Sequence, residues 1–299
     1  MIKVAFDPIY AHPLPENHRF PMLKYDLIPQ QLQYEGTYSP EQFFSPKPCK
    51  KNVILQTHDS EYFEKLINQQ LSQREQRVVG FPQSQELIQR ELIITQGTID
   101  NCMYALDHKI SLNVAGGTHH AFTNRGEGFC LLNDMATAAN WLLKKKYSKK
   151  ILIVDLDVHQ GNGTAQIMKD NDHVFTFSMH GANNYPARKE ISDLDIGLKD
   201  GISGEEYLSI LMDILPKLLT NVKPDFVFYL AGVDILETDK LGKLKVSMED
   251  CKRRDEFVLG QMKKQNIPVT IALGGGYSPS IKTIVEAHCN TFRIASALF

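Results

Sequence analysis

Short apolar runs recur along the chain and are separated by stretches with a helical period. The runs are rich in β-branched residues and end at polar or glycine positions, as buried strands do. They cover residues 2–6, 110–114, 151–158, 174–178, 226–231 and 268–273. Amphipathic helical spacing appears in residues 87–107, 133–146, 207–219 and 251–264. Alternating strands and helices predict an α/β fold with a mostly parallel sheet flanked by helices.

Local signals refine this prediction. Capping boxes, Ser203-Gly-Glu-Glu206 and Ser247-Met-Glu-Asp250, precede the last two predicted helices. The segment 36–50, rich in proline and aromatic residues, is predicted to be a surface loop. No repeat, low-complexity tract or change in composition marks a boundary, so we expect a single domain over residues 1–299.

Polar side chains gather where the predicted strands end. Asp155, Asp157 and His159 alternate with Leu156 and Val158, so the three polar side chains share one face of the chain. Similar polar or glycine-rich segments follow three other strands, at residues 113–120, 231–234 and 273–277. Ligands of open α/β sheets bind outside the carboxyl ends of the strands. We therefore expect these four segments to form one cleft.

The chemistry of this cleft is that of a hydrolytic metal site. Asp157, His159 and Asp234 offer one nitrogen and two oxygen ligands, which leaves room for water on a tetrahedral zinc ion. Iron(II) or manganese would also accept this set. Because two carboxylates cancel the charge of the ion, a separate proton acceptor is needed, and His119 and His120 offer one. Tyr277 could stabilise a developing oxyanion.

Simpler structural interpretations of each motif stay open at this point. Polar residues at the end of a strand often cap the next helix, and an isolated Asp-x-His pair is weak evidence for a metal. Tyr277 could cover a sheet edge behind the turn of Gly274, Gly275 and Gly276. Phe129 could be a core residue.

Composition narrows the class of protein. The chain has 299 residues, 42% of them hydrophobic, and a formal charge of −2, which gives no reason to expect nucleic acid or an anionic membrane as a partner. Its five cysteines contain no Cys-x-x-Cys pair, so a disulfide framework or thiolate zinc site is not expected. The first residues do not resemble a secretory signal, and no apolar run reaches the roughly 20 residues of a membrane span. We expect a cytoplasmic protein.

Five segments taken together resemble the zinc-dependent histone deacetylases of the arginase/deacetylase fold. They occur in the family's order and span most of the chain. They are Gly116-Gly-Thr-His-His-Ala-Phe122, Gly126-Glu-Gly-Phe-Cys-Leu-Leu-Asn-Asp134, Val154-Asp-Leu-Asp-Val-His-Gln-Gly-Asn-Gly163, Ala231-Gly-Val-Asp234 with Leu241-Gly242, and Leu273-Gly-Gly-Gly-Tyr277. The segments 10–15 and 18–22 look most like class IV members and their bacterial relatives.

The resemblance implies an amidohydrolase that removes acetyl or longer acyl groups from lysine or a similar amine. By analogy, Asp157, His159 and Asp234 would bind zinc, and His120 would act as general base and then acid. His119 would orient water with Asp155 as its partner, and Tyr277 would polarise the acyl carbonyl. The acyl-lysine tunnel would be lined by Gly128, Phe129, Tyr185 and Gly275. A structural potassium ion, frequent in the family, would use Asp155, Asp157, His159, Ser178 and Met179.

Asn162 departs from many deacetylases, which have an aspartate at this position as the partner of the second histidine. A neutral amide raises the pKa of a histidine less than a carboxylate does. We therefore expect His120 to stay unprotonated, and competent as a base, to lower pH.

Other functions compatible with this sequence differ in substrate, in metal or in activity. An acetylpolyamine or other small acyl-amine presents the same amide as acyl-lysine does. A ureohydrolase with two manganese ions would need a further acid where this chain has Gly161. A non-catalytic acyl-lysine reader would not need His119, His120 or Tyr277. Neither the oligomeric state nor the native metal follows from the sequence.

Overall fold

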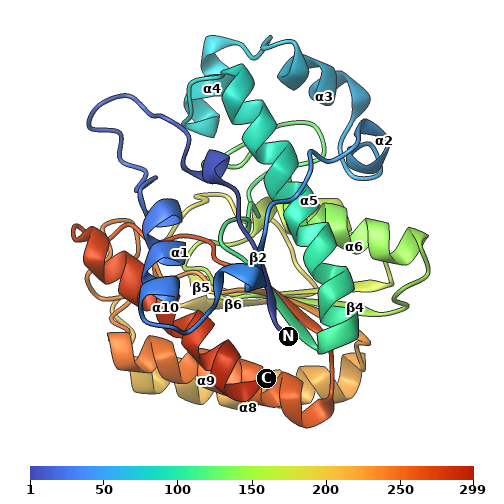
Figure 1. The fold of residues 1–299 in the computed structure, drawn as a ribbon. Helices are drawn as coiled ribbons and strands as arrows, with labels where there is room; N and C mark the ends of the chain where they lie inside the picture. Colours follow the sequence, from blue (N-terminus) through green and yellow to red (C-terminus); the bar gives the residue numbers. More distant parts are fainter.

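The centre of the fold is an eight-stranded sheet in which all neighbouring strands run parallel (Figure 1). A computed structural model describes residues 1–299. The strand order across the sheet is β2-β1-β3-β8-β7-β4-β5-β6. The strands are β1 (Lys3–Ala5), β2 (Phe43–Phe44), β3 (Ile110–Asn113), β4 (Ile151–Asp155), β5 (Val174–Gly181), β6 (Leu194–Leu198), β7 (Phe226–Leu230) and β8 (Val269–Ala272).

Helices cover both faces of this sheet. Helix α5 packs on β1, β3 and β8 and contacts α6, whereas α8, α9 and α10 form a layer on the opposite side, continued by α1 (Figure 1). The longer helices are α1 (Lys24–Tyr34), α5 (Gln85–His108), α6 (Asp134–Lys144), α8 (Gly204–Val222), α9 (Met248–Gln265) and α10 (Ile281–Leu298). The shorter ones are α2 (Lys51–Ile54), α3 (Ser60–Ile67), α4 (Gln73–Val79) and α7 (Asn162–Met168), with 3-10 turns η1 (Pro8–Ala11) and η2 (Pro40–Gln42).

The central strands are continuous apolar runs because both of their faces are covered. Every residue of β3, β4, β7 and β8 is buried. This is the pattern of a parallel sheet between two helical layers, where neither face meets water. The buried apolar residues form one cluster of 82 side chains, which gives the strands a rigid support.

The predicted α/β architecture is confirmed, and all six predicted strands are present. Two further strands, β2 and β6, were not predicted. Both are edge strands, and only one of their residues, Leu198, is buried, so their sequences lack a clear apolar run. The segment 36–50 is accordingly not only a loop, because it contains η2 and the strand β2 that pairs with β1.

Helix starts follow the capping signals. The Ser203 hydroxyl accepts from the backbone N–H of Glu206, and the Glu206 side chain accepts from the backbone of Ser203. Ser247 caps α9 through the N–H of Asp250. All five cysteines are buried and unpaired. None of the helices has both the length and the apolar character needed to cross a bilayer.

Candidate active site

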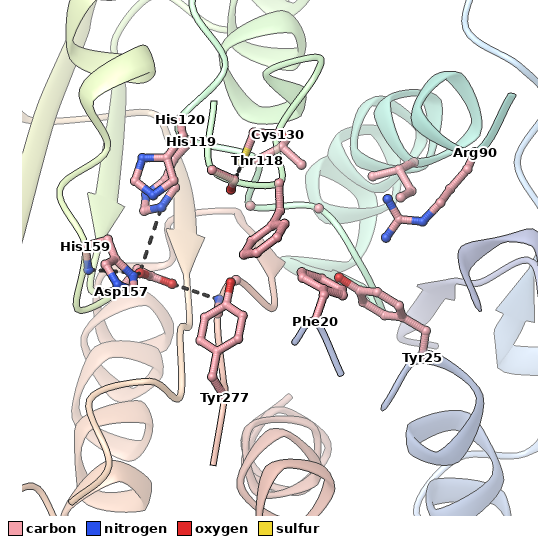
Figure 2. Close-up of a pocket in the computed structure, with 17 residues that line it drawn as sticks. Phe20, Tyr25, Arg90, Thr118, His119, His120, Cys130, Asp157, His159 and Tyr277 are labelled. Carbon is pink, nitrogen blue, oxygen red and sulfur yellow. Dashed lines mark hydrogen bonds and ion pairs between the residues drawn. The ribbon is translucent and has the colours of Figure 1, made fainter. Parts of the chain in front are cut away.

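The four polar segments predicted from the sequence gather around one pocket, which three of them line and which the fourth, residues 231–234, adjoins through the contact of Asp234 with His159. They follow β3, β8, β7 and β4, which are consecutive neighbours in the sheet. Because these strands are parallel, their carboxyl ends lie at the same edge. The pocket in Figure 2 is lined by His119 and His120 after β3, Asp157 and His159 after β4, and Tyr277 after β8. The expected single cleft is therefore present.

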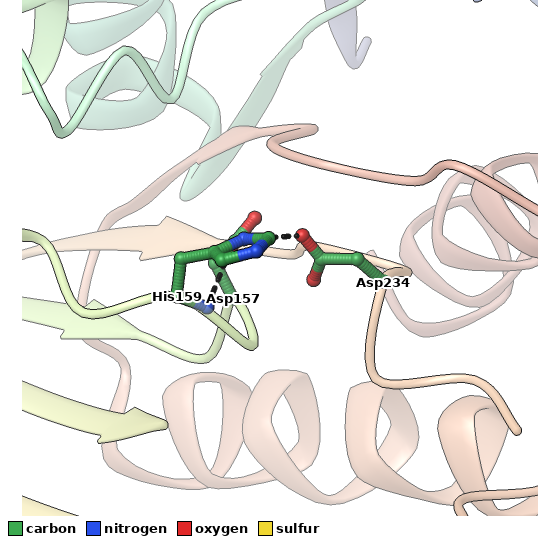
Figure 3. Close-up of side chains that lie close together, drawn as sticks. All are labelled: Asp157, His159 and Asp234. Atoms are coloured by element: carbon green, nitrogen blue, oxygen red, sulfur yellow. Dashed lines mark hydrogen bonds and ion pairs between the residues drawn. The ribbon is translucent and has the colours of Figure 1, made fainter. Parts of the chain in front are cut away.

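Asp157, His159 and Asp234 form a buried cluster (Figure 3), and the first two of them line the pocket. The His159 Nδ1 atom lies 3.0 Å from Asp157 Oδ1 and 3.1 Å from Asp234 Oδ2. One ligand atom from each residue lies within 4.8 Å of the others, a spacing that a single cation can bridge. The two strand ends thus bring together residues that are 75 positions apart in the chain.

Backbone N–H groups hold both carboxylates in place. The N–H of Gly275 donates to Asp157 Oδ2 at 2.8 Å, and that of Val158 donates to Asp234 Oδ1 at 2.9 Å. A side chain at Gly275 would collide with both carboxylates, so glycine is required there. Gly275 therefore positions the carboxylates as well as lining the pocket.

The charge of the cluster fits a divalent cation. Burial raises the pKa of Asp234 to about 7, with a further contribution from the neighbouring Asp157 carboxylate. Burial alone would lower the pKa of His159, but the Asp157 and Asp234 carboxylates raise it to about 10. Two acids and an imidazole buried this closely require a positive charge among them, and their oxygen and nitrogen donors are those that zinc, iron(II) and manganese accept. These three residues are the candidate metal ligands.

The two histidines beside this cluster have different partners. His119 Nδ1 donates to Asp155 Oδ2 and His120 Nδ1 donates to Asn162 Oδ1, each at 2.7 Å. Both partner oxygens only accept, so each ring carries its proton on Nδ1 and directs Nε2 away from this bond. The Asp155 carboxylate raises the pKa of His119 above its usual value, against the opposing effect of burial. Burial and the two neighbouring histidines lower the pKa of His120 well below it.

Glu127 extends the second of these pairs and was not predicted as a site residue. Its Oε2 atom accepts from Asn162 Nδ2 at 3.2 Å and from the Tyr185 hydroxyl at 2.7 Å. Its Oε1 atom accepts from Arg125 Nε at 2.8 Å. The Glu127 carboxylate therefore contacts His120 indirectly, through the Asn162 amide. By accepting from Nδ2, it orients Asn162 so that Oδ1 faces the His120 ring. Glu127 lies within the Gly126–Asp134 segment, but its position in the sequence does not indicate a contact with Asn162 or Tyr185.

Tyr277 and the predicted tunnel residues line the entrance to the cluster. The Tyr277 hydroxyl points into the pocket (Figure 2), and its backbone N–H donates to Asp239 Oδ2 at 2.6 Å. The Phe129 ring lies 6.1 Å from the Tyr277 ring and forms one wall with Gly128. Tyr185, 41% exposed, lies at the mouth with its ring edge-on to His120 at 4.9 Å.

The turn that carries Gly128 and Phe129 has an unusual backbone. Both residues have positive φ angles, 50° and 67°. Their N–H groups bond to the carbonyls of Val78 and Val79 at the end of α4. A Cβ atom at Gly128 would lie 2.7 Å from His120 Cδ2. Gly128 is therefore needed for its backbone conformation and for its close approach to the His120 ring.

Buried polar residues behind the pocket hold its loops and were also missed. Asp134 accepts from the N–H of Thr118 at 2.9 Å, next to the histidine pair. Lys24 Nζ donates to the Gly274 carbonyl at 2.9 Å, and burial lowers the pKa of this lysine to about 8. Arg254 donates to the Gly232 carbonyl at 2.5 Å, two residues before Asp234. Only their tertiary contacts reveal these roles.

The candidate potassium ligands lie on two adjacent strands, β4 and β5, or, for Asp157 and His159, just after β4. Asp155 of β4 is the register partner of Ser178 of β5, and Met179 follows it. The Ser178 hydroxyl is hydrogen-bonded to His180 Nδ1 at 2.9 Å. The potassium site stays a prediction.

Known proteins resemble this chain in sequence and in fold. A family model described as the histone deacetylase domain matches residues 18–292. An uncharacterized protein of Picosynechococcus sp. is 42% identical over 99% of both chains, and histone deacetylase 2 of Arabidopsis thaliana is 29% identical over 90% of this chain and 72% of its own. The crystal structure of the HDA15 HD domain superposes with a TM-score of 0.81 at 21% identity and covers 97% of this chain and 89% of that one.

The Gly128 contact predicts a specific loss of activity. Gly128→Ala pushes the His120 ring from its place, and a displacement of this kind reduces kcat by about 100-fold. Gly201→Ala is the matched control, because Gly201 also has a positive φ, 71°, but a Cβ atom added there would have no neighbour within 4 Å. Both variants should lose stability in thermal unfolding, Gly128→Ala more than Gly201→Ala because of the contact with His120, and only Gly128→Ala should lose turnover. Equal kcat values for the two variants would contradict this assignment.

The Asn162 pairing predicts a shift in pH dependence. In Asn162→Asp, a carboxylate replaces the amide on His120 Nδ1 and raises the pKa of this histidine. A base with a higher pKa is protonated at higher pH, so the acidic limb of the kcat/KM profile moves upward. Glu127→Gln in the Asn162→Asp background removes the second carboxylate and should reduce the shift. An acidic limb that stays in place or moves downward in Asn162→Asp would show that Asn162 does not control His120.

Proposed function

The chain belongs to the histone deacetylase family and is a hydrolase that acts on amide bonds. We propose that it removes acetyl groups from acetylated lysine with a zinc ion held by Asp157, His159 and Asp234. The observation that supports this most directly is the grouping of these ligands with two histidines and Tyr277 around one pocket. These side chains supply the ligands, the proton acceptor and the oxyanion donor that metal-assisted amide hydrolysis uses.

The first step is proton transfer by His120. When bound, zinc supplies a Lewis acid that acidifies water and polarises the acyl carbonyl. His120 has its Nδ1 proton held by Asn162 and its Nε2 lone pair free, so it takes the proton of the attacking water. The low pKa of His120 keeps this nitrogen unprotonated beforehand. The same Nε2 then gives the proton to the departing lysine amine.

His119 and Tyr277 stabilise the charge that develops on the acyl group. The Asp155 carboxylate favours a protonated His119 ring, which orients the water and offsets negative charge. Tyr277 stays protonated, because burial and the Asp157 and Asp234 carboxylates raise its pKa well above the usual value. Its hydroxyl therefore donates a hydrogen bond to the carbonyl oxygen as that oxygen becomes an oxyanion.

The size of the inner cavity favours a short acyl group. Its volume of about 40 Å³ corresponds to roughly three water-sized spaces. An acetyl group fits this volume, whereas a long fatty chain requires the walls to move. Because segments 10–15 and 18–22 resemble class IV members, longer acyl groups belong in the test of substrates.

Metal binding gives the first test of this proposal. We expect one zinc ion per chain by elemental analysis, and a content well below one in Asp234→Asn, which keeps the shape of the side chain but removes its charge. Asp170→Asn, at an exposed position near the end of α7, is the control. At free zinc of 100 times Kd, the ion stabilises the fold by about 2.7 kcal/mol, or about 4 °C in Tm for a chain of 299 residues. Full zinc binding by Asp234→Asn would refute this ligand set.

Hydrolysis of a neutral acetyl-lysine peptide is the direct test of the activity. We expect turnover that a zinc-chelating hydroxamate abolishes, with acetyl preferred over longer acyl groups. Tyr277→Phe removes only the hydroxyl, and the loss of an oxyanion donor lowers kcat by about 100- to 1000-fold. KM should change little in Tyr277→Phe if the hydrogen bond strengthens only in the transition state. Absence of turnover with every acyl length on the wild-type protein would overturn the proposal.

A further inference from the structure

Two surface grooves meet at the mouth of the catalytic pocket. The first, of about 240 Å³, is lined by residues that include Arg19, Asn184, Tyr185 and Lys243, and we call it the mouth groove. The second, of about 570 Å³, is lined by residues that include Arg19, Pro21, Lys240 and Pro279, and we call it the side groove. Both contain Arg19, Leu241 and Tyr277, so they are continuous. A substrate with its acyl-lysine in the pocket passes over this surface.

The charged side chains that line these grooves are all cations. They are Arg19, Lys240 and Lys243, all exposed, and no aspartate or glutamate lines either groove. Arg19 lies over the Phe129 ring, with its guanidinium carbon 5.0 Å from the ring centroid, and neither Arg19 nor Lys240 has an ion-pair partner within 4 Å. Lys243 is 4.0 Å from Asp200 and donates to the Asn183 carbonyl.

The carboxylates nearest to the mouth are already engaged. Glu127 accepts from Arg125, Tyr185 and Asn162. Asp239 accepts from the backbone N–H groups of Tyr277, Leu241 and Gly242. Glu16 and Glu237 are exposed nearby in the sequence but line neither groove. The side chains that line the two grooves therefore offer a substrate three cations and no carboxylate.

We propose that the substrate is an extended polypeptide segment with aspartate or glutamate residues beside the acylated lysine. This inference rests on the proposed deacylase function and names the substrate class for the same site. Arg19 lines both grooves, whereas Lys243 lines only the mouth groove and Lys240 only the side groove. Acidic flanks gain favourable contacts with these cations, whereas the ammonium groups of a polyamine or of a basic tail are repelled.

The expected size of this preference is modest and depends on salt. Each exposed ion pair changes affinity by about 1.4- to 5-fold. Three cations together give about a tenfold preference in kcat/KM for acidic over basic flanks. Because exposed charges are screened, most of this preference should disappear at about 1 M salt.

The experiment compares three peptides of equal length that place acetyl-lysine between aspartates, between serines or between lysines, with N-acetylspermidine as a fourth substrate. We expect kcat/KM to fall in the order aspartate, serine, lysine, with the polyamine lowest. In the triple variant Arg19→Gln, Lys240→Gln, Lys243→Gln, the ratio of the aspartate to the lysine peptide should approach one. The matched control is the triple variant Lys144→Gln, Lys145→Gln, Lys149→Gln, which removes the same number of positive charges. These lysines lie at the end of α6 or between it and the start of β4, at the amino end of that strand, whereas the active site lies at the carboxyl ends. This control should keep the wild-type ratio.

The outcomes separate the two proposals. If the serine peptide is hydrolysed but the flanks make no difference, or lysine flanks or N-acetylspermidine are preferred, the acidic-substrate inference is overturned and the deacylase function stands. If none of the peptides is hydrolysed, the deacylase function fails and this inference falls with it. A preference for acidic flanks that persists at high salt and in the triple variant would also overturn the role of these three cations.

Discussion

The structure depends on holding two carboxylates and an imidazole together in a buried place. Holding Asp157, His159 and Asp234 together costs free energy, because the two carboxylates repel each other and all three groups lose their hydration. They stay together because each follows a central strand whose apolar residues are locked between two helical layers. The large apolar core therefore determines the distances within a small polar cluster.

A second set of buried polar contacts transmits this rigidity to the loops. Lys24 binds the glycine turn before Tyr277, Arg254 binds the carbonyl of Gly232, and Asp134 binds the loop of the histidine pair. Each contact joins segments far apart in sequence. Breaking one partner would leave a buried polar or charged group unpaired, which is why loops this rich in glycine can still hold catalytic side chains in fixed positions.

The two histidines show how one pocket gives similar rings different properties. His119 is bound directly to a carboxylate, whereas His120 is bound to an amide that is itself bound to the Glu127 carboxylate. The direct contact with Asp155 raises the pKa of His119 against the effect of burial, whereas burial and the two neighbouring histidines lower the pKa of His120, and its amide partner does not offset them. A stabilising cation and a proton acceptor can therefore lie side by side, with ring centroids 4.1 Å apart.

The sequence by itself determined the α/β class, the six main strands and the residues that gather at the strand ends. It could do so because burial on both faces leaves an apolar run, and because the carboxyl ends of parallel strands meet at one edge. Only the tertiary structure decided which strands are neighbours, and hence that Asp234 reaches the Asp157 and His159 pair. It also revealed the roles of Glu127 and Lys24, because a contact between distant segments leaves no pattern in the nearby sequence. The cations around the mouth were missed for a similar reason, since the sequence does not show which charges lack a partner. Such features depend on how loops pack, and loop packing follows from the whole core rather than from any one segment.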